Sequence, residues 1–371
     1  MKIICSKEEL LNGLKLTQPI AQAKATLPIL SNVLFEAQGS EVRLSATDLE
    51  TGISCYIKAE VVEDGAITIP AQRLMDIVKE LPETNIEINV TDDKIKISAN
   101  KSKFNLVGIH KKDFPTMPEY NKDFIFSISR ANLITMFKKT IVSVSKDMQR
   151  FILNGVCFTT TNDNKLKVAS TDGKRLSFIE RETINETKPI QVVIPTKAVA
   201  DFLKLFSAMT TENVQVSIGN NLITFIVGDI IFQSKLIEGN FPNYEQVMPK
   251  GNNNTIKLNT LETLSAIKQA ALIANGNIAT GGTSVIKITF EKNKMTISAE
   301  SSNVGSGEIE LDIENDLPKI TINFNPNYIR DVLQNVEEET FTFAYTKAEA
   351  PVIMTPVKDN KYICVVMPIR N

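Results

Sequence analysis

Residue types that usually build catalytic and metal sites are scarce in this sequence. His110 is the only histidine, and no metal-ligand spacing surrounds it. A hydrolase triad or metal site based on histidine would need it, so we interpret His110 as a surface or packing residue. The G-x-x-x-x-G-K-[ST] phosphate loop is absent, and the glycines at 281–282 and 305–307 do not complete G-x-G-x-x-G after a strand. We therefore expect no catalytic residue, no metal and no cofactor.

Cysteine is also sparse, and long apolar runs are missing. Cys5, Cys55, Cys157 and Cys364 are scattered without a C-x-x-C pair, which predicts reduced, buried thiols in a cytosolic protein. No apolar run reaches the roughly 18 residues that span a bilayer. Hydrophobic residues make up 43% of the chain and charged residues 23%, which indicates a globular protein that does not enter a membrane.

Four carboxylates alternate with apolar residues near the end of the chain. Glu308, Glu310, Asp312 and Glu314 are each two residues apart, so a strand would place all four on one face. We interpret this face as solvated or as protection of a sheet edge, and not as a metal site.

The net charge is slightly acidic, but it is unevenly distributed. The chain carries −2 overall, whereas nucleic-acid-binding domains are usually basic. The six predicted helices below sum to +4, so the remaining residues sum to −6. This mild separation points to nucleic acid only if all the helices face one way.

One pattern is repeated six times: an apolar strand that runs directly into an amphipathic helix. Ile3 and Ile67, which begin two copies, are 64 positions apart, and so are Ile256 and Ile320. Internal repetition of this kind governs the architecture. The apolar stripes predict helices over residues 7–18, 71–81, 130–142, 196–208, 260–274 and 326–336.

Two helix starts carry capping signals. Ser6 precedes a helix with Glu9 three positions on, as in a capping box. Asn325 places a capping residue ahead of Pro326 in the first turn.

Between the helices the apolar period falls to two. Residues 86–98 and 214–227 read as hairpins, and 340–345 repeats the alternation. The repeating unit is therefore β-α-β-β-β, and its short connections predict antiparallel sheets. Two units per domain give three similar domains, with polar boundaries near residues 120 and 251. We predict an α+β fold with domains over 1–121, 122–251 and 252–371.

Several strings on this repeat resemble one family over the whole length of the chain: the bacterial DNA polymerase III β subunits, or sliding clamps. They are TLPILSNVLFEA (26–37), ATDLE (46–50), LNGVCF (153–158), STDGKRL (170–176), SKLIEGNFPNY (234–244) and VVMPIR (365–370). The resemblance implies the DNA-clamp fold, in which two subunits join head to tail into a ring with sheets outside and helices lining a channel for duplex DNA. It implies a bacterial, cytoplasmic, nucleoid-associated processivity factor without an active site of its own.

In such a ring all the helices face the channel. The positive charge of the predicted helices would then lie on the side that meets DNA. A mildly basic lining that does not read bases suits sliding, since each phosphate contact adds affinity that depends on salt. By this resemblance, the residues expected to face DNA are Lys24, Arg73, Lys138, Lys139, Lys146, Arg150 and Lys197.

The resemblance also implies a pocket for short peptides that carry glutamine and hydrophobic anchors. Its partners would be the replicative DNA polymerase α subunit, the clamp loader δ subunit and other proteins with a clamp-binding motif. Part of the pocket is the DG-containing sequence 171–176, which reads as a turn between hairpin strands. The matching residues are Leu153, Thr171, Gly173, Lys174, Arg175, Leu176, Pro242, Gln246, Val247, Val365, Val366, Met367, Pro368, Ile369 and Arg370. Lys174 and Gln246 replace residues common in the family, as does Asn371 at the end of the tail.

The subunit interface implied by the resemblance joins the first domain of one chain to the third domain of the other. Phe104 and Leu106 lie at matching positions on one side, and Leu272 and Ile273 on the other. Residues 275–284 differ from the family in length and lack its basic residues. One alternative is an interaction scaffold of the same fold that never closes on DNA, and another is an enzyme whose site has no recognisable motif.

Overall fold

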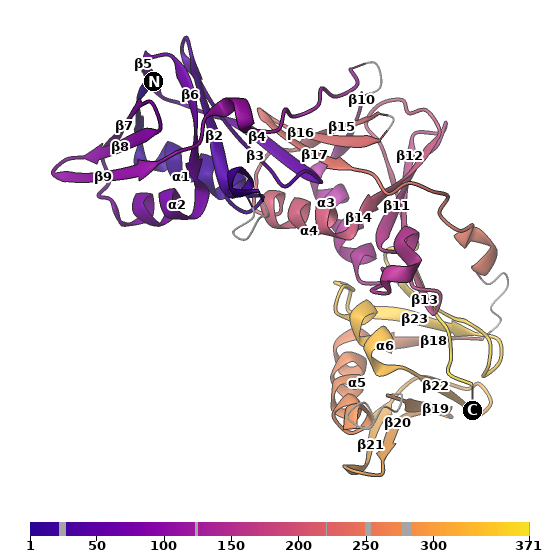
Figure 1. Cartoon of the computed structure of the whole chain (residues 1–371). Helices are drawn as coiled ribbons and strands as arrows, with labels where there is room; N and C mark the ends of the chain where they lie inside the picture. Colours follow the sequence, from indigo (N-terminus) through magenta and orange to yellow (C-terminus); the bar gives the residue numbers. More distant parts are fainter. Residues whose placement is uncertain (22–26, 123–124, 220, 249–253, 277–283, 371) are drawn as a thin grey trace. The chain divides into compact units, whose positions relative to one another are not determined.

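The computed structural model describes residues 1–21, 27–122, 125–219, 221–248, 254–276 and 284–370. It divides into two compact units (Figure 1): unit 1 is Met1–Ala131 with Lys197–Leu236, and unit 2 is Asn132–Thr196 with Ile237–Asn371. Each unit combines two distant stretches of chain because strands from both share a sheet. The domain boundaries after residues 121 and 251 stay a prediction.

Each of the six predicted helices is present, with ends within three residues of those expected. They are α1 (Lys7–Thr17), α2 (Ala71–Glu80), α3 (Arg130–Ile141), α4 (Thr196–Phe206), α5 (Thr260–Ala274) and α6 (Pro326–Leu333).

Both predicted helix caps are formed. The Ser6 hydroxyl accepts a hydrogen bond from Glu9 N at 3.2 Å, and the Asn325 side chain accepts from Asn327 N at 2.9 Å. The Glu9 carboxylate accepts from Lys58 N at 3.2 Å. The capping signal thus located the start of α1, while the glutamate ties the helix to a neighbouring strand.

Two antiparallel sheets form the described part of unit 1. The first has the order β5 (Glu60–Glu63), β1 (Lys2–Ser6), β7 (Asn85–Thr91), β8 (Lys94–Ala99) and β9 (Ser102–Val107). The second has the order β10 (Ile125–Ser129), β15 (Asn213–Ile218), β16 (Leu222–Val227), β17 (Ile230–Lys235), β4 (Thr51–Ile57), β3 (Glu41–Thr47), β2 (Asn32–Gln38) and β6 (Gly65–Pro70).

The described part of unit 2 repeats this arrangement. Its larger sheet has the order β14 (Ile190–Pro195), β11 (Gly155–Thr160), β12 (Lys165–Thr171), β13 (Arg175–Glu182), β25 (Tyr362–Val366), β24 (Val352–Pro356), β23 (Thr340–Tyr345) and β18 (Asn254–Asn259). Its smaller sheet has the order β21 (Gly305–Asp312), β20 (Lys294–Ser301), β19 (Ile286–Glu291) and β22 (Ile320–Phe324).

The element order contains six copies of β-α-β-β-β, from β1-α1-β2-β3-β4 to β22-α6-β23-β24-β25, with β5 as an addition. Copies meet edge to edge: β4 pairs with β17 in unit 1, and β13 pairs with β25 in unit 2. Both joints are antiparallel, so each larger sheet runs on from one part of the chain to another without a break.

Helices cover one face of the larger sheet in unit 2. Strand register carries one face from Phe158 across β12 and β13 to Tyr362. The ring of Phe137 on α3 lies 6.3 Å from that of Phe158, and Lys139 Nζ lies 4.7 Å from the ring of Tyr362. The alternating residues of the same strands face the other way, so the opposite face is free of α3.

The same rule holds in unit 1. Phe232 pairs with Ile53, two residues from Cys55, so these side chains share a face. Cys55 contacts Gly13 O of α1 at 4.0 Å, and the rings of Phe202 on α4 and Phe232 lie 6.4 Å apart. Helices from two repeats therefore cover the same face of one sheet.

The carboxylates at 308–314 lie at a sheet edge, as expected. Glu308, Glu310 and Asp312 are exposed on β21, the outermost strand of the smaller sheet in unit 2. The strand ends at Asp312, so Glu314 follows it. The predicted hairpins at 86–98 and 214–227 are β7–β8 and β15–β16.

We predict that Phe202→Ala lowers the free energy of unfolding by about 3–5 kcal/mol. Phe202 is fully buried, and its ring centroid lies 4.8 Å from that of Phe206 and 4.8 Å from that of Phe225, so truncation leaves a cavity between α4 and the sheet. Urea unfolding followed by circular dichroism measures the change. Phe151→Ala, at a position 60% exposed, is the control, and an equal effect of the two variants would contradict this packing.

Candidate functional site

A groove of about 830 Å³ opens on unit 2 beside the β12–β13 turn. It is bounded by this turn, by the end of β25 and by residues 237–248. We call residues 237–248 the second strap, because an equivalent first strap lies earlier in the chain, in unit 1. Most of the residues predicted for the peptide pocket line it: Leu153, Thr171, Gly173, Lys174, Arg175, Leu176, Pro242, Gln246, Val247, Val365 and Met367. The sequence did not point to four further lining residues, which are Asn243, Tyr244, Met248 and Pro351.

The end of the chain contributes only in part. Val365 and Met367 line the groove, but Val366 is fully buried and its side chain faces the other side of the sheet. Pro368, Ile369 and Arg370 do not line it. The backbone N–H of Ile369 donates to Asn323 O of β22 at 2.8 Å, which holds the tail against the smaller sheet. Of the predicted tail residues, Val365 and Met367 therefore line the groove, strand alternation turns Val366 away, and residues 368–370 lie beyond the groove.

The groove floor is apolar and its rim is polar. Leu153, Leu176, Val365 and Tyr244 are buried and belong to one cluster, on the face of the sheet that α3 does not cover. Val247, in contrast, is 56% exposed. A buried floor beside an exposed aliphatic side chain is suited to a small hydrophobic segment.

The β12–β13 turn is fixed by its own side chains. Asp172 Oδ1 accepts hydrogen bonds from Lys174 N at 2.9 Å and Arg175 N at 3.0 Å. The Thr171 hydroxyl donates to Arg175 O at 2.6 Å. Gly173 has φ +85°, a conformation that glycine adopts without strain. The predicted turn is thus confirmed.

A buried arginine links this turn to α6. Arg175 Nε lies 3.1 Å from Asp172 Oδ2, and a terminal guanidinium nitrogen lies 2.8 Å from Asp331 Oδ2. Its guanidinium also lies 4.6 Å from the centre of the Tyr328 ring. Burial and the nearby Asp172 raise the pKa of Tyr328. The charge of Arg175 is therefore compensated inside the protein, and its function in the groove is to hold the turn against α6.

Unit 1 contains the same carboxylate arrangement with a different cation. Lys197 Nζ lies 2.7 Å from Asp48 Oδ2 and 2.7 Å from Asp201 Oδ2. Asp48 is in the β3–β4 turn and Asp201 is on α4. Burial favours the protonated form of Asp48, but the hydrogen bond and charge of Lys197, together with hydrogen bonds from the backbone N–H groups of Thr51 and Glu50, hold its pKa below the usual value. We call each aspartate–cation–aspartate bridge a clasp; it joins a turn to a helix beside a joint.

The residues predicted to face DNA differ widely in exposure. Arg73, Lys138, Lys146 and Arg150 are exposed. Lys197 is half-exposed but belongs to a clasp. Lys24 lies outside the described residues.

Lys139, in contrast, is buried. It is only 4% exposed, and its ammonium lies 3.2 Å from Asp359 Oδ2 and against the Tyr362 ring. Burial alone would raise the pKa of Asp359, but Arg181 and Lys139 together lower it. Burial and the ion pair with the half-buried Asp359 count against the prediction that Lys139 contacts DNA.

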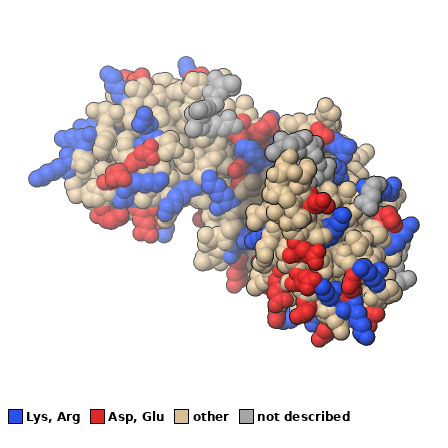
Figure 2. Space-filling model, turned by 90° about the horizontal axis from the view of Figure 1, so that it is seen from below, with Lys and Arg blue, Asp and Glu red and all other residues tan. Residues whose placement is uncertain are grey.

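On the face shown in Figure 2, lysine and arginine are interspersed with aspartate and glutamate. Such a surface suits weak contacts with phosphates more than tight adhesion.

The predicted interface residues lie at exposed positions. Phe104 is 38% exposed on β9, the outermost strand of the smaller sheet in unit 1, and Leu106 is half-buried beside it. Leu272 is 75% exposed near the end of α5, and Ile273 is half-buried. Exposed apolar groups beside an open strand edge are typical of interfaces.

Cysteine chemistry is suppressed by burial. All four cysteines are buried and unpaired, and burial raises the pKa of Cys5 and Cys55 to about 12 and that of Cys157 and Cys364 to about 11. Within the described ranges, no group of three His, Cys, Asp or Glu side chains is placed to hold a metal ion. No helix in the described part of the chain is long and apolar enough to cross a membrane.

Known proteins with this fold were found by sequence and by structure. Family models of the DNA polymerase III beta subunit match residues 1–118 (N-terminal domain), 127–243 (central domain) and 245–370 (C-terminal domain). A beta sliding clamp of Chlamydia trachomatis is 30% identical over 100% of this chain and 87% of its own length.

Solved structures of sliding clamps show the same similarity. The DNA polymerase III subunit beta of Pseudomonas aeruginosa superposes with a TM-score of 0.93 at 28% identity, covering 100% of both chains. The DNA polymerase sliding clamp of Bacillus subtilis gives 0.94 at 25% identity, covering 100% of this chain and 99% of the other. The fold is thus of the sliding-clamp class. The chain belongs to the family of DNA polymerase III beta subunits.

We predict that Asp331→Asn lowers the free energy of unfolding by about 1.5–3 kcal/mol, because a buried arginine loses one of its two charged partners. Urea unfolding of the full chain measures it. Asp316→Asn, at an exposed position, is the matched control and should be near neutral. If the two variants unfold alike, the clasp does not stabilise the joint.

Proposed function

We propose that this sliding clamp closes around duplex DNA as a head-to-tail homodimer and confers processivity on the replicative DNA polymerase. It binds DNA without sequence preference, has no active site of its own, and acts in the bacterial cytoplasm at the nucleoid. The family match carries this proposal, together with the open edges of β9 and β21, each an end strand of one of the two smaller sheets. In the dimer, the β9 edge of one subunit meets the β21 edge of the other.

Linkage explains how a protein of net charge −2 stays on DNA. A closed ring needs no strong adhesion, and strong phosphate binding would add drag that depends on salt. Exposed Arg73, Lys138, Lys146 and Arg150 supply a few positive charges. Lys197 and Lys139 contribute little further positive charge, because the first is held in a clasp and the second is buried.

The groove on unit 2 is the proposed dock for short peptides of partner proteins. Its partners are the polymerase α subunit, the clamp loader δ subunit and other proteins with a clamp-binding motif. Burying two aliphatic anchors contributes roughly 3–6 kcal/mol, at about 1.5–3 each, and the cost of association offsets much of it. Exchangeable binding follows, which allows several partners to share one site.

We expect that deletion of Met367–Asn371 abolishes binding of a peptide derived from the polymerase α subunit. The deletion removes Met367 from the groove wall and the hydrogen bond from its N–H to Lys174 O, 2.9 Å long. Fluorescence anisotropy measures affinity, and gel filtration checks that the dimer persists. Removal of Asn371 alone is the control, and unchanged affinity of the longer deletion would refute this dock.

A double substitution, Leu272→Asp with Ile273→Asp, should convert the dimer into monomers of 41.1 kDa, because the interface would bury unpaired charges. Sedimentation velocity measures the mass. Leu261→Asp is a matched control on the same helix, since Leu261 and Leu272 are each 75% exposed, and it should leave the dimer intact. A double variant that still sediments as a dimer would place the interface elsewhere. A wild-type monomer would favour the scaffold that never closes on DNA.

A further inference from the structure

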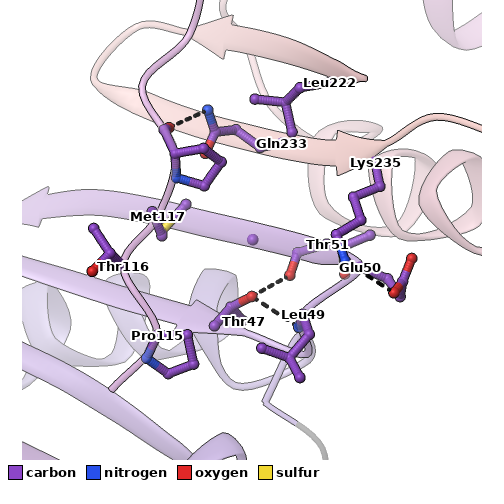
Figure 3. Close-up of a pocket in the computed structure, with 12 residues that line it drawn as sticks. Thr47, Leu49, Glu50, Thr51, Pro115, Thr116, Met117, Leu222, Gln233 and Lys235 are labelled. Atoms are coloured by element: carbon purple, nitrogen blue, oxygen red, sulfur yellow. Dashed lines mark hydrogen bonds and ion pairs between the residues drawn. The ribbon is translucent and has the colours of Figure 1, made fainter. Parts of the chain in front are cut away.

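A second pocket, of about 420 Å³, lies in unit 1 beside the β3–β4 turn. Figure 3 shows Pro115, Thr116 and Met117 along one side, Lys235 on the opposite side, Leu222 at one end and Leu49 at the other. We call residues 109–118 the first strap. Neither the proposed DNA-facing residues nor the peptide groove includes this pocket.

The turn beside this pocket repeats the hydrogen bonds that threonine and aspartate make to the backbone in the turn beside the groove. The Thr47 hydroxyl donates to Thr51 O at 2.8 Å, as Thr171 does to Arg175 O at 2.6 Å. In each turn the backbone N–H two residues after the threonine donates to the threonine hydroxyl oxygen. The donors are Leu49 N at 3.1 Å and Gly173 N at 3.0 Å. The clasp aspartate follows each threonine directly.

The strand joints and the straps are repeated as well. Lys235 N donates to Glu50 O at 2.9 Å, and Met367 N donates to Lys174 O at 2.9 Å. Each strap bridges to the last strand of its sheet, through Ile109 to β6 and through Ile237 to β14. Each then reaches a buried phenylalanine followed by proline, at 114–115 and 241–242. The second pocket is therefore the internal copy of the peptide groove.

Leu49 is the clearest difference between the two copies. It stands where the groove turn has Gly173, and its φ is +75° against +85° for the glycine. A leucine in this region is strained, yet its side chain is 43% exposed at the mouth of the pocket. The fold thus holds an apolar side chain open to solvent where glycine would be easier.

The floor and rim of the unit 1 pocket determine which kind of ligand it would accept. Gly52 and Gln233 occupy the register positions of Leu176 and Val365, so the floor is more polar and the pocket is smaller. Met117 covers Gly52, since a Cβ there would lie 2.9 Å from the methionine methyl.

Strap and rim are both fixed. Gln233 donates to Pro118 O at 3.0 Å, which fixes the first strap. Glu50 and Lys235 are ion-paired at 3.3 Å, so the rim carries no net charge and matches an uncharged segment.

We propose that the unit 1 pocket is a second docking site for a short, extended, uncharged peptide segment of a partner protein, with one aliphatic side chain held between Leu49 and Met117. The inference rests on the proposed peptide-docking function of the first groove, because it takes the second as a copy of the first. Its smaller volume admits one anchor where the groove admits two. A partner that carries both kinds of segment would bind more tightly than through either one.

Methyl NMR of the full-length protein with labelled methionine methyl groups reads the two sites separately. Met117 reports the second pocket, and Met367 reports the first groove. The probe for the second pocket is acetyl-Ser-Leu-Pro-amide, with acetyl-Ser-Asp-Pro-amide as its control. The probe for the first groove is the hexapeptide Gln-Leu-Ser-Leu-Pro-Leu.

We expect a saturable shift of the Met117 methyl with the leucine tripeptide and not with the aspartate tripeptide. Leu49→Gly should weaken that binding about tenfold or more, the loss expected for one buried aliphatic contact. Glycine accepts the backbone conformation, so this variant keeps its fold. An unmoved Met117 methyl, or undiminished affinity in Leu49→Gly, overturns the second site. A Met367 methyl unmoved by the hexapeptide counts against the first groove, and so against the proposed function.

Discussion

Edge-to-edge pairing of strands is the constraint on which the rest of the structure depends. A strand edge exposes unpaired N–H and C=O groups and invites another strand. Neighbouring repeats pair these backbone groups with one another where β4 meets β17 and where β13 meets β25. Because partner strands share a face, each joint carries helices over one side of the sheet and leaves the other side to a strap and a pocket. In the proposed ring, two of the end strands of the smaller sheets, β9 and β21, are where the subunits meet.

The clasps show how one device serves both joints with different residues. Each pairs a turn aspartate with an aspartate on a helix, but the cation comes from α4 in unit 1, as Lys197, and from β13 in unit 2, as Arg175. Each cation is compensated on two sides, so these residues add little to the field that DNA would meet. A count of basic residues would assign Lys197 and Arg175 to DNA binding, whereas each one holds a turn against a helix.

Sequence periodicity predicted the six helices, the hairpins and the repeating unit, because these depend on local patterns of burial. It could not separate Lys138 from Lys139, since adjacent helix residues differ by about 100° in direction and the partner of Lys139, Asp359, lies 220 residues away. Tyr244 and Met248 were missed because a strap has no period. The second pocket did leave a signal: TDLET at 47–51 and TDGKR at 171–175 stand at equivalent places in two repeats.

We propose that linkage, and not adhesion, keeps this protein on DNA. The direct measurement is gel filtration of the protein after a clamp loader has placed it on a nicked circular plasmid, before and after one enzyme cuts the circle. If the ring is linked to DNA, the protein co-elutes with the circle at high salt and is lost once the DNA is linear. Equal retention on circular and linear DNA, falling steeply with salt, would contradict it.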